Sequence, residues 1–588
     1  GWDTHGLPVE LGVETKLGIT KEDIGKKISV DDYNHACREE VMKYKDLWDD
    51  LTRKMGYWVD LNDPYITFSN EYIETLWFLL SELYKKGLLY KGYTIQPFSP
   101  AAGTGLSSHE LNMPGCYRDV KDTTCIAMFR LKAGQTLPFD TKIKSEDIHF
   151  LAWTTTPWTL PSNTALCVGP NIEYVLVKTY NPYSGQLIHV IIAKPLLNSI
   201  FPSENANISF EDYQQGDKKI PFQVMGNAVT GKELKNISYE QLIPWVNPGD
   251  GAFRVILGDY VTTEDGTGIV HIAPTFGADD AFVARNAGIP PVFMYTKKGE
   301  YRPMVDLTGK FFDTADLDEN FVKQCVNYDI YKEYEARWVK NAYDPQFTVN
   351  GKYDDKAAAA AESLDIYICM KMKADNLAFK IEKHVHNYPH CWRTDKPVLY
   401  YPLDSWFIRS TACKERMIEL NKSINWKPES TGTGRFGKWL ENLNDWNLSR
   451  SRYWGTPLPI WRTEDNAEEI CIESVEQLYN EVEKAVAAGV MTSNPYKDAG
   501  FVPGDYSTEN YDKIDLHRPF VDDITLVSAS GKPMKRETDL IDVWFDSGSM
   551  PYAQIHYPFE NKELLDSGMV FPADFIAEGV DQTRGWFF

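Results

Sequence analysis

Apolar residues recur every three or four positions in two stretches near the start of the chain, which predicts two amphipathic helices. The first covers residues 31–55, with its apolar positions at Tyr33, Cys37, Val41, Tyr44, Leu47, Trp48, Leu51 and Met55. The second begins at Asn70, a residue type that suits a helix N-cap, and ends near Gly87. Its apolar stripe, which we expect to pack on a sheet or another helix, is Ile73, Leu76, Trp77, Leu80 and Leu83.

The pattern changes near residue 146, where short apolar runs alternate with Asn, Pro, Gly and Ser. Residues 174–178 and 189–193 are two such runs, and they predict strands. This β-rich pattern continues to about residue 384, interrupted by helical pieces such as residues 357–362, and helical and loop sequence then resumes. We therefore expect one discontinuous domain with a β-rich domain inserted into it.

The composition is that of a globular protein with room for about four domains of roughly 150 residues. The chain has 588 residues, of which 43% are hydrophobic and 25% charged, so intrinsic disorder is excluded as the main state. No run of 18 apolar residues predicts a membrane span. The nine Cys include no C-x-x-C pair, which fits a reducing cytoplasm. The chain neither starts with Met nor ends on a helix stop, so we expect a piece of a longer protein.

The net charge of −23 argues against nonspecific nucleic-acid binding over the whole surface, although a local basic groove stays open. Aromatic residues are numerous, with 17 Trp, 33 Tyr and 28 Phe, which suits either a large core or pockets with flat walls.

Three segments combine charged residues with Gly, Pro or Trp. Residues 1–10 read G-W-D-T-H-G-L-P-V-E, which is typical of a rigid polar loop. Residues 446–461 contain two Arg and three Trp, which fits either Arg that stacks on aromatic rings and contacts phosphate, or buried Trp with solvated Arg. Residues 542–549 read D-V-W-F-D-S-G-S, and residues 578–587 read E-G-V-D-Q-T-R-G-W-F.

A fourth pattern lies in the β-rich part. Residues 152–163 read A-W-T-T-T-P-W-T-L-P-S-N, and residues 266–280 read G-T-G-I-V-H-I-A-P-T-F-G-A-D-D. Three successive Thr before a Pro are by themselves typical of a strand edge.

Together, these strings resemble those of the isoleucyl-tRNA synthetases, a class I aminoacyl-tRNA synthetase family, and the resemblance covers essentially the whole chain. Leucyl enzymes typically read G-W-D-A-F-G-L-P and valyl enzymes G-W-D-H-A-G, whereas this chain has Thr4 and His5 after its Asp. Both sister families usually carry Thr-Thr-Arg-Pro where this chain has Thr156, Pro157 and Trp158.

The resemblance implies a fold, a reaction and partners. The fold would be α/β, with a Rossmann-like class I catalytic domain in two parts, residues 1–145 and 385–588, and an inserted β-rich editing domain at residues 146–384. The reaction would join isoleucine to AMP, using ATP with Mg²⁺, and then to the 3′ end of the isoleucine-specific tRNA. We expect a cytoplasmic location, and neither a membrane nor DNA as partner.

The match also assigns the isoleucine and adenylate site. Asp3 would hold the ammonium group of the amino acid through a charge-assisted hydrogen bond. Two indoles would wall a narrow slot for the branched side chain. The residues that complete this site by the same match are Trp544, Trp586, Gln582, Glu578, Gly579 and Asp581.

The inserted part matches the family's proofreading domain, which hydrolyses tRNA charged with valine. A second site is needed because one missing methylene is worth about 1–3 kcal/mol, a range for which isoleucine against valine in this family is the standard example. Asp280 would grip the ammonium group, and His271 with Thr159 would exclude isoleucine. The remaining matched residues, around the ester and along the pocket wall, are Thr154, Thr155, Thr156, Trp158 and Asn163. No catalytic triad or Cys nucleophile is apparent, so water would attack an ester held in place.

The chain departs from the family in two ways. The H-I-G-H and K-M-S-K-S strings are absent, so we expect a fragment whose ligase activity needs missing flanks. Many relatives also hold zinc with two C-x-x-C pairs, but here only Cys391 remains, and the other ligand places read Ser99, Ala102 and Thr394. One thiolate cannot form a tetrahedral site, so we expect no zinc. Three nearby histidines lack a partner at ligand spacing: His384, His386 and His390.

Two rival readings stay open: a stand-alone aminoacyl-tRNA deacylase, and a noncatalytic tRNA-binding editing module. Asp3, Trp544, Gln582 and Trp586 argue against the first, because a hydrolase would not need them. The second is disfavoured by the intact Thr154, His271 and Asp280.

Overall fold

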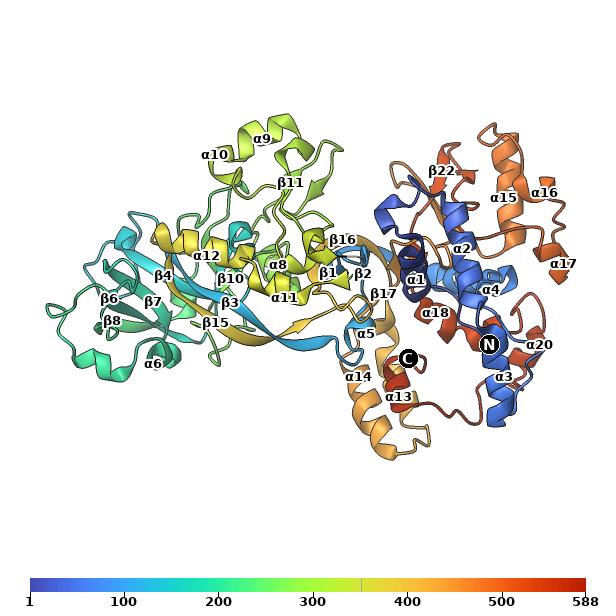
Figure 1. Cartoon of the computed structure of the whole chain (residues 1–588), viewed down its shortest axis with the longest axis horizontal. Coiled ribbons are helices and arrows are strands. Elements are labelled where there is room, and N and C mark those ends of the chain that lie inside the picture. Colours follow the sequence, from blue (N-terminus) through green and yellow to red (C-terminus); the bar gives the residue numbers. More distant parts are fainter. Residues whose placement is uncertain (350–351) are drawn as a thin grey trace.

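The computed structural model describes residues 1–349 and 352–588, and Figure 1 shows two lobes joined by a long antiparallel ribbon. The ribbon consists of β3 (Tyr117–Arg130) and β15 (Ala378–Pro389), which pair from Tyr117↔Pro389 to Ala127↔Ala378. We call residues 117–389 the β-rich lobe and the remainder the helical lobe. The insertion therefore leaves and rejoins the helical lobe through two neighbouring strands.

The helical lobe begins with α1 (Leu7–Leu17), α2 (Val30–Met42), α3 (Lys45–Met55) and α4 (Asn70–Lys85). A four-stranded sheet follows, formed by β1 (Leu89–Ser99), β2 (Thr104–Gly105), β16 (Leu399–Ile408) and β17 (Trp446–Asn447). Trp2 pairs in parallel with Ile66 and thereby places the start of the chain beside α4.

The second half of the helical lobe contains small sheets and short helices. Its strands are β18 (Ser449–Arg450), β19 (Ile460–Thr463), β20 (Glu469–Cys471), β21 (Thr525–Val527), β22 (Pro533–Arg536) and β23 (Leu540–Ile541). Its main helices are α13 (Lys414–Asn421), α14 (Gly437–Glu441), α15 (Val475–Ala487), α18 (Val543–Gly548), α19 (Met550–Ala553) and α20 (Lys562–Asp566).

The β-rich lobe is built on a nine-stranded sheet that includes the ribbon. Its other strands are β4 (Ile148–Thr154), β5 (Ala165–Val168), β6 (Glu173–Tyr180), β7 (Leu187–Ala193), β8 (Phe222–Thr230), β9 (Arg254–Leu257) and β10 (Ile269–Ile272). Helices α8 (Ala278–Asn286), α9 (Glu319–Cys325), α10 (Tyr328–Tyr331), α11 (Asp355–Ala360) and α12 (Leu364–Ala374) accompany it (Figure 1). The predicted strands at 174–178 and 189–193 and the helical piece near 357–362 are thus confirmed, as is the α/β class with its β-rich insertion.

The prediction of one helix over residues 31–55 is wrong, because the chain breaks between α2 and α3. The apolar residues of α2, Tyr33 and Cys37, are fully buried, whereas Leu47 and Trp48 of α3 are 66% and 57% exposed. No common apolar face therefore holds the two halves in line. The second helix is confirmed as α4, but Ser69 rather than Asn70 is its N-cap, and the Asn70 side chain donates instead to two distant carbonyls.

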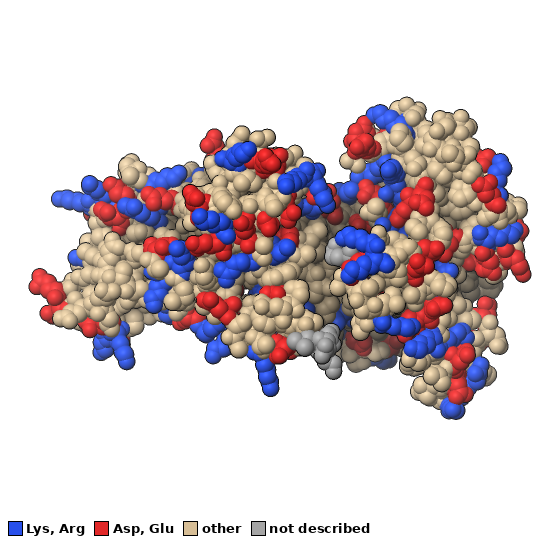
Figure 2. Space-filling model, turned by 45° about the horizontal axis from the view of Figure 1, so that its top comes forward, with Lys and Arg blue, Asp and Glu red and all other residues tan. Residues whose placement is uncertain are grey.

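The surface carries both signs of charge. On the face that Figure 2 shows, Lys and Arg alternate with Asp and Glu over both lobes. Within the described part of the chain, no helix is both long and apolar enough to cross a lipid bilayer. The domain boundaries at 145/146 and 384/385 stay a prediction.

Candidate functional site

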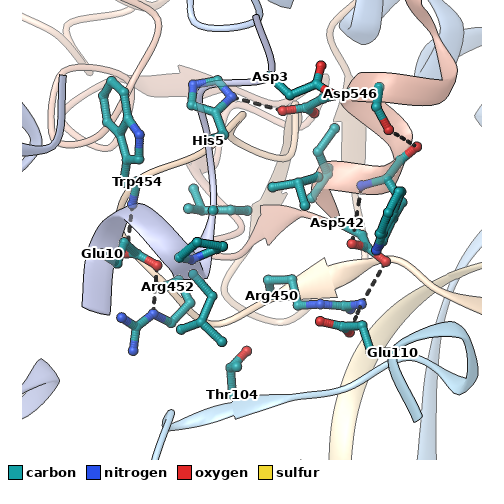
Figure 3. A pocket seen from close by; sticks show the side chains of 18 of the residues that line it. Asp3, His5, Glu10, Thr104, Glu110, Arg450, Arg452, Trp454, Asp542 and Asp546 are labelled. Carbon is teal, nitrogen blue, oxygen red and sulfur yellow. Dashed lines mark hydrogen bonds and ion pairs between the residues drawn. The ribbon is translucent and has the colours of Figure 1, made fainter. Parts of the chain in front are cut away.

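A cavity of about 340 Å³ lies in the helical lobe, where the start of the chain meets the segment from β23 to α18 (Figure 3). Its wall contains Asp3, Trp544 and Asp546, together with the buried Arg450 and Arg452. Residues more than 500 positions apart in the sequence therefore share one pocket, which we call the first cavity.

Gly6 gives this pocket its shape. Its backbone has φ of 103°, which L-residues with a side chain rarely adopt, and a Cβ there would lie 2.7 Å from Val543 Cγ1. The turn sends the His5 side chain into the protein, and α1 starts immediately afterwards with Pro8 in its first turn. The glycine thus permits a loop and a helix to meet at the cavity.

Two buried arginines tie the cavity wall together. Arg450 contacts Glu110 at 2.8 Å and Asp542 at 2.7 Å, and Arg452 contacts Glu10 at 2.8 Å. The prediction of solvated arginines is wrong, because both guanidinium groups are buried and paired with carboxylates. Sequence spacing could not show this, since the carboxylates come from distant segments. Phosphate contact by these arginines stays a prediction. The ion pairs hold the wall in one geometry.

Asp3 lies at the opening of the first cavity, close to Asp546. Burial of its carboxyl and then the charge of Asp546 raise the pKa of Asp3 to about 6. A carboxyl group with this pKa is ionised at neutral pH, and a carboxylate beside a small cavity is suited to bind an ammonium group.

The C-terminal segment brings the predicted wall residues together. Gln582 Oε1 accepts from the Trp586 backbone N–H at 3.2 Å, and the Trp586 indole N–H donates to the Ser547 carbonyl at 2.9 Å. A Cβ on Gly585 would lie 3.3 Å from the Trp544 ring, so Trp544 packs directly against this turn. Trp544 lines the cavity, whereas Trp586 and Gln582 lie behind it.

The other three predicted residues of this site are exposed and do not line the first cavity: Glu578, Gly579 and Asp581. Burial, followed by the charges of Asp3 and Glu578, raises the pKa of the Tyr65 phenol. Glu578 therefore lies on the side of the cavity where Asp3 opens to solvent.

A second cavity, also of about 340 Å³, lies in the β-rich lobe at the ends of β4 and β10. Thr154, Thr155 and His271 line it, together with Tyr260 and the loop at Asp265. Three of the predicted residues therefore share one pocket, which we call the second cavity.

In the second cavity, a series of hydrogen bonds through Thr156 and Thr159 links Thr154 to His271. The Thr156 N–H donates to Thr154 Oγ1 at 3.1 Å, and the Thr159 hydroxyl donates to the Thr156 carbonyl at 2.8 Å. Thr159 has then used its only proton, so it must accept from His271 Nε2 at 3.1 Å. This makes His271 the Nε2–H tautomer, and burial keeps it neutral by lowering its pKa to about 4.

Asp280 lies in the first turn of α8 and accepts from the Ala273 N–H at 2.8 Å. Burial raises the pKa of Asp280 to about 7; the Ala273 hydrogen bond opposes this rise and the Asp279 charge adds to it. Asp280 is not among the residues that line the second cavity, whereas Tyr260 is. Burial, and then the charges of Cys167 and Asp280, raise the pKa of Tyr260.

Two predicted pocket residues lie within the fold itself. Asn163 is buried, donates to the Ala165 carbonyl at 2.8 Å and accepts from the Tyr239 hydroxyl at 2.7 Å. Trp158 is buried, its ring packs against Phe276, and its backbone N–H donates to Asp365. Both support the loop that carries Thr154 to Thr159.

Sequence reasoning missed several residues of both cavities. His5 stands inside the string of residues 1–10 and Asp546 inside that of residues 542–549, so both carried a local signal. Tyr260 carries no local signal of its own. His517, which contacts His5, could not be found, because 512 residues separate the two imidazoles.

The places where relatives have zinc ligands are filled by ordinary packing. Ser99 Oγ accepts from the Ala102 N–H at 3.2 Å, and Cys391 lies in an apolar cluster with Leu106 and Val398. In residues 1–349 and 352–588, no group of three or more His, Cys, Asp or Glu could hold a metal. His386 contacts Asp122 instead, at 3.1 Å. The expected lack of zinc stays a prediction.

Comparison with known proteins gives one consistent result. The model of the "tRNA synthetases class I (I, L, M and V)" matches residues 1–588. The isoleucine–tRNA ligase of Bacteroides thetaiotaomicron is 74% identical over 599 residues, which cover all of this chain and 51% of the relative. That of Porphyromonas gingivalis is 67% identical, covering all of this chain and 50% of the relative. The chain thus spans about half the length of the curated relatives it matches.

Among solved structures, the ternary complex of Agrobacterium radiobacter K84 agnB2 LeuRS-tRNA-LeuAMS aligns over 99% of this chain and 54% of its own, with 13% identity and a TM-score of 0.31. The match of the family model is what decides the assignment. From its first to its last residue, the chain belongs to the class I tRNA synthetases of the isoleucine, leucine, methionine and valine group.

Proposed function

We propose that the chain is the central part of an isoleucine–tRNA ligase that activates isoleucine with ATP and transfers it to the isoleucine-specific tRNA in the cytoplasm. The observation that carries the proposal is the first cavity, in which an ionisable Asp3 faces a pocket walled by Trp544. Identity of 74% to an isoleucine–tRNA ligase along the whole chain supports it.

In this proposal Asp3 binds the ammonium group, and the indoles of Trp544 and Trp586 enclose the aliphatic side chain. Gln582 fixes the turn that presents Trp586, because it accepts from the backbone N–H of that residue. The exposed residues Glu578, Gly579 and Asp581 would contact the aminoacyl-adenylate.

ATP with Mg²⁺ would supply the adenylyl group. The H-I-G-H and K-M-S-K-S strings, which in the family meet the phosphates, do not occur in residues 1–588. The residues of this chain therefore account for the amino-acid end of the reaction, and we derive no step through the metal.

We propose that the second cavity hydrolyses valyl-tRNA. Asp280 would hold the ammonium group, and the hydroxyls of Thr154, Thr155 and Thr156 would surround the ester and the terminal ribose. His271, neutral and fixed by Thr159, would limit the size of the amino acid. Rate would come from positioning of the ester and of water. The inserted domain would comprise residues 146–384.

The test is isoleucine-dependent pyrophosphate exchange by the full-length protein. Asp3→Asn removes a charge-assisted hydrogen bond of about 1.5–3 kcal/mol, so kcat/KM for isoleucine should fall about 10–150-fold. Asp63→Asn, a change at an exposed carboxylate nearby, is the matched control and should leave the rate unchanged. The proposal fails if the wild type shows no exchange with isoleucine. If the chain were part of a stand-alone deacylase, Asp3→Asn would leave the rate of deacylation unchanged, and neither the variant nor the wild type would show exchange.

A further inference from the structure

Two histidines from opposite ends of the chain meet beside the first cavity. The Nε2 atoms of His5 and His517 lie 2.9 Å apart. His5 Nδ1 is 2.8 Å from Asp546 Oδ2, and His517 Nδ1 is 2.6 Å from Asp515 Oδ1. Figure 3 shows the inner end of this line of groups, where His5 points to Asp546 and Asp3 lies beside them. Four ionisable groups thus form one line with three short contacts.

The number of protons in this line follows from its geometry. Each contact between two such atoms needs one proton, so three contacts need three protons. Two neutral imidazoles and two carboxylates bring only two. The Arg38 guanidinium also lies 3.2 Å from His517 Nδ1, but this Nδ1 is only 2.6 Å from Asp515 Oδ1 and so must carry its own proton. With that proton on Nδ1 and the His5 proton in the contact with Asp546, two lone pairs would face each other between the Nε2 atoms at 2.9 Å. The line therefore holds one excess proton.

The surroundings decide where this proton resides. Burial acts to raise the pKa of Asp515, but His517 and Arg38 outweigh it and leave that pKa below its usual range. The Arg38 guanidinium lies 3.0 Å from Asp515. The outer carboxyl is therefore ionised, and the excess proton lies on His517, His5 or Asp546. Burial lowers the pKa of His517 to about 4, so the proton stays with His5 and Asp546, and that pair carries no net charge.

Trp454 holds both imidazoles in place. Its ring stacks on His517 at 4.8 Å with an angle of 10° between the planes, and it meets His5 edge-on at 5.1 Å. Its indole N–H donates to the Thr4 carbonyl at 2.8 Å. The indole therefore fixes the planes of both imidazole rings while their Nε2 atoms lie in contact.

We propose that His5 and His517 are positioning residues for amino-acid binding: they retain one excess proton that cancels the charge of Asp546 and leaves Asp3 ionised for the ammonium group of the substrate. This inference rests on the proposed function of the first cavity. The ionisable side chains that face Asp3 are Asp546 and His5. Arg393, which also lines the cavity, stacks on the Trp392 ring at 3.7 Å. The remaining charged residues of the wall are paired with each other: Glu10, Glu110, Arg450, Arg452 and Asp542.

The first experiment measures binding of L-isoleucine to the full-length protein by calorimetry from about pH 5.5 to about pH 8.5. His517→Phe keeps the stacking on Trp454 but removes the Nε2 partner, so His5 no longer needs the excess proton. The charge of Asp546 then acts on Asp3, and the pH midpoint of binding should rise by about one unit, with roughly tenfold weaker binding below it. His35→Phe, at an exposed histidine, should keep the wild-type profile.

Equal weakening at all pH values, or a profile identical to that of the wild type, would overturn the inference and leave the proposed function intact. Absence of isoleucine binding by the wild type would instead refute the proposed function.

The second experiment needs no substitution. Nitrogen-15 NMR of histidine-labelled protein at pH 7 should show one proton bridging the Nε2 atoms of His5 and His517, with both Nδ1 atoms protonated or one shared with Asp546. His517→Phe assigns the signals. Two neutral imidazoles without a proton between their Nε2 atoms would contradict the proposal, whatever the enzyme does.

Discussion

Replacing Asp280 by Asn separates the charge of this side chain from its structural contact. Asp280 accepts from the Ala273 N–H at 2.8 Å, and an amide oxygen can keep that hydrogen bond. The change therefore removes only the attraction to the ammonium group, about 1.5–3 kcal/mol, so hydrolysis of valyl-tRNA should fall about 10–150-fold. Isoleucine activation should be unchanged, because Asp280 lies in the β-rich lobe and the first cavity in the helical lobe.

The pH dependence sharpens this test. The pKa of Asp280 is about 7, raised by burial, so its carboxylate is progressively protonated as pH falls through 7. The rate of valyl-tRNA hydrolysis by the wild type should therefore fall as the pH drops below about 7. The rate of the Asp280→Asn variant should not change in that range. Asp250→Asn, at an exposed carboxylate of the β-rich lobe that does not act on Asp280, is the control. Equal losses in both variants, or a parallel loss of isoleucine activation, would refute the reasoning.

Four further outcomes are expected. Arg452→Met leaves the buried carboxylates of Glu10 and Glu14 without their cationic partner and should cost about 3–5 kcal/mol in urea unfolding; a change under 1 kcal/mol would contradict the ion-pair account. Gly6→Ala should destabilise more than Gly18→Ala, because both have positive φ but only Gly6 would also collide with a neighbour. Burial opposes protonation of His556, but two carboxylates outweigh it and raise its pKa, so His556→Gln should destabilise more at about pH 6 than at about pH 9. Elemental analysis should show far less than one zinc per chain, and a stoichiometric, chelator-resistant zinc would contradict this.

Local patterns were enough to predict elements whose burial depends on their own residues. The stripe of α4 and the runs in β6 and β7 are of this kind, because their apolar spacing matches the period of the element. The break between α2 and α3 was not predictable, since apolar spacing does not reveal that Leu47 and Trp48 have no partner in the described chain.

The candidate sites show the same limit. Strings such as residues 152–163 identify groups that are close in sequence, and the structure places Thr154 and Thr155 in one cavity with His271. The partners of Arg450 and of His5 come from segments hundreds of residues away, so only the three-dimensional fold brings them together. Sequence spacing indicated which segments form the candidate sites, but not which charged groups pair with each other in them.

The central claim is that one chain carries two pockets of different selectivity. Its most direct test is a side-by-side measurement of deacylation, with valyl-tRNA and isoleucyl-tRNA as substrates of the same preparation. The account predicts that valyl-tRNA is hydrolysed and isoleucyl-tRNA is spared, because in the proposed function His271 and Thr159 would exclude the larger isoleucine side chain. Equal rates on the two charged tRNAs would contradict it.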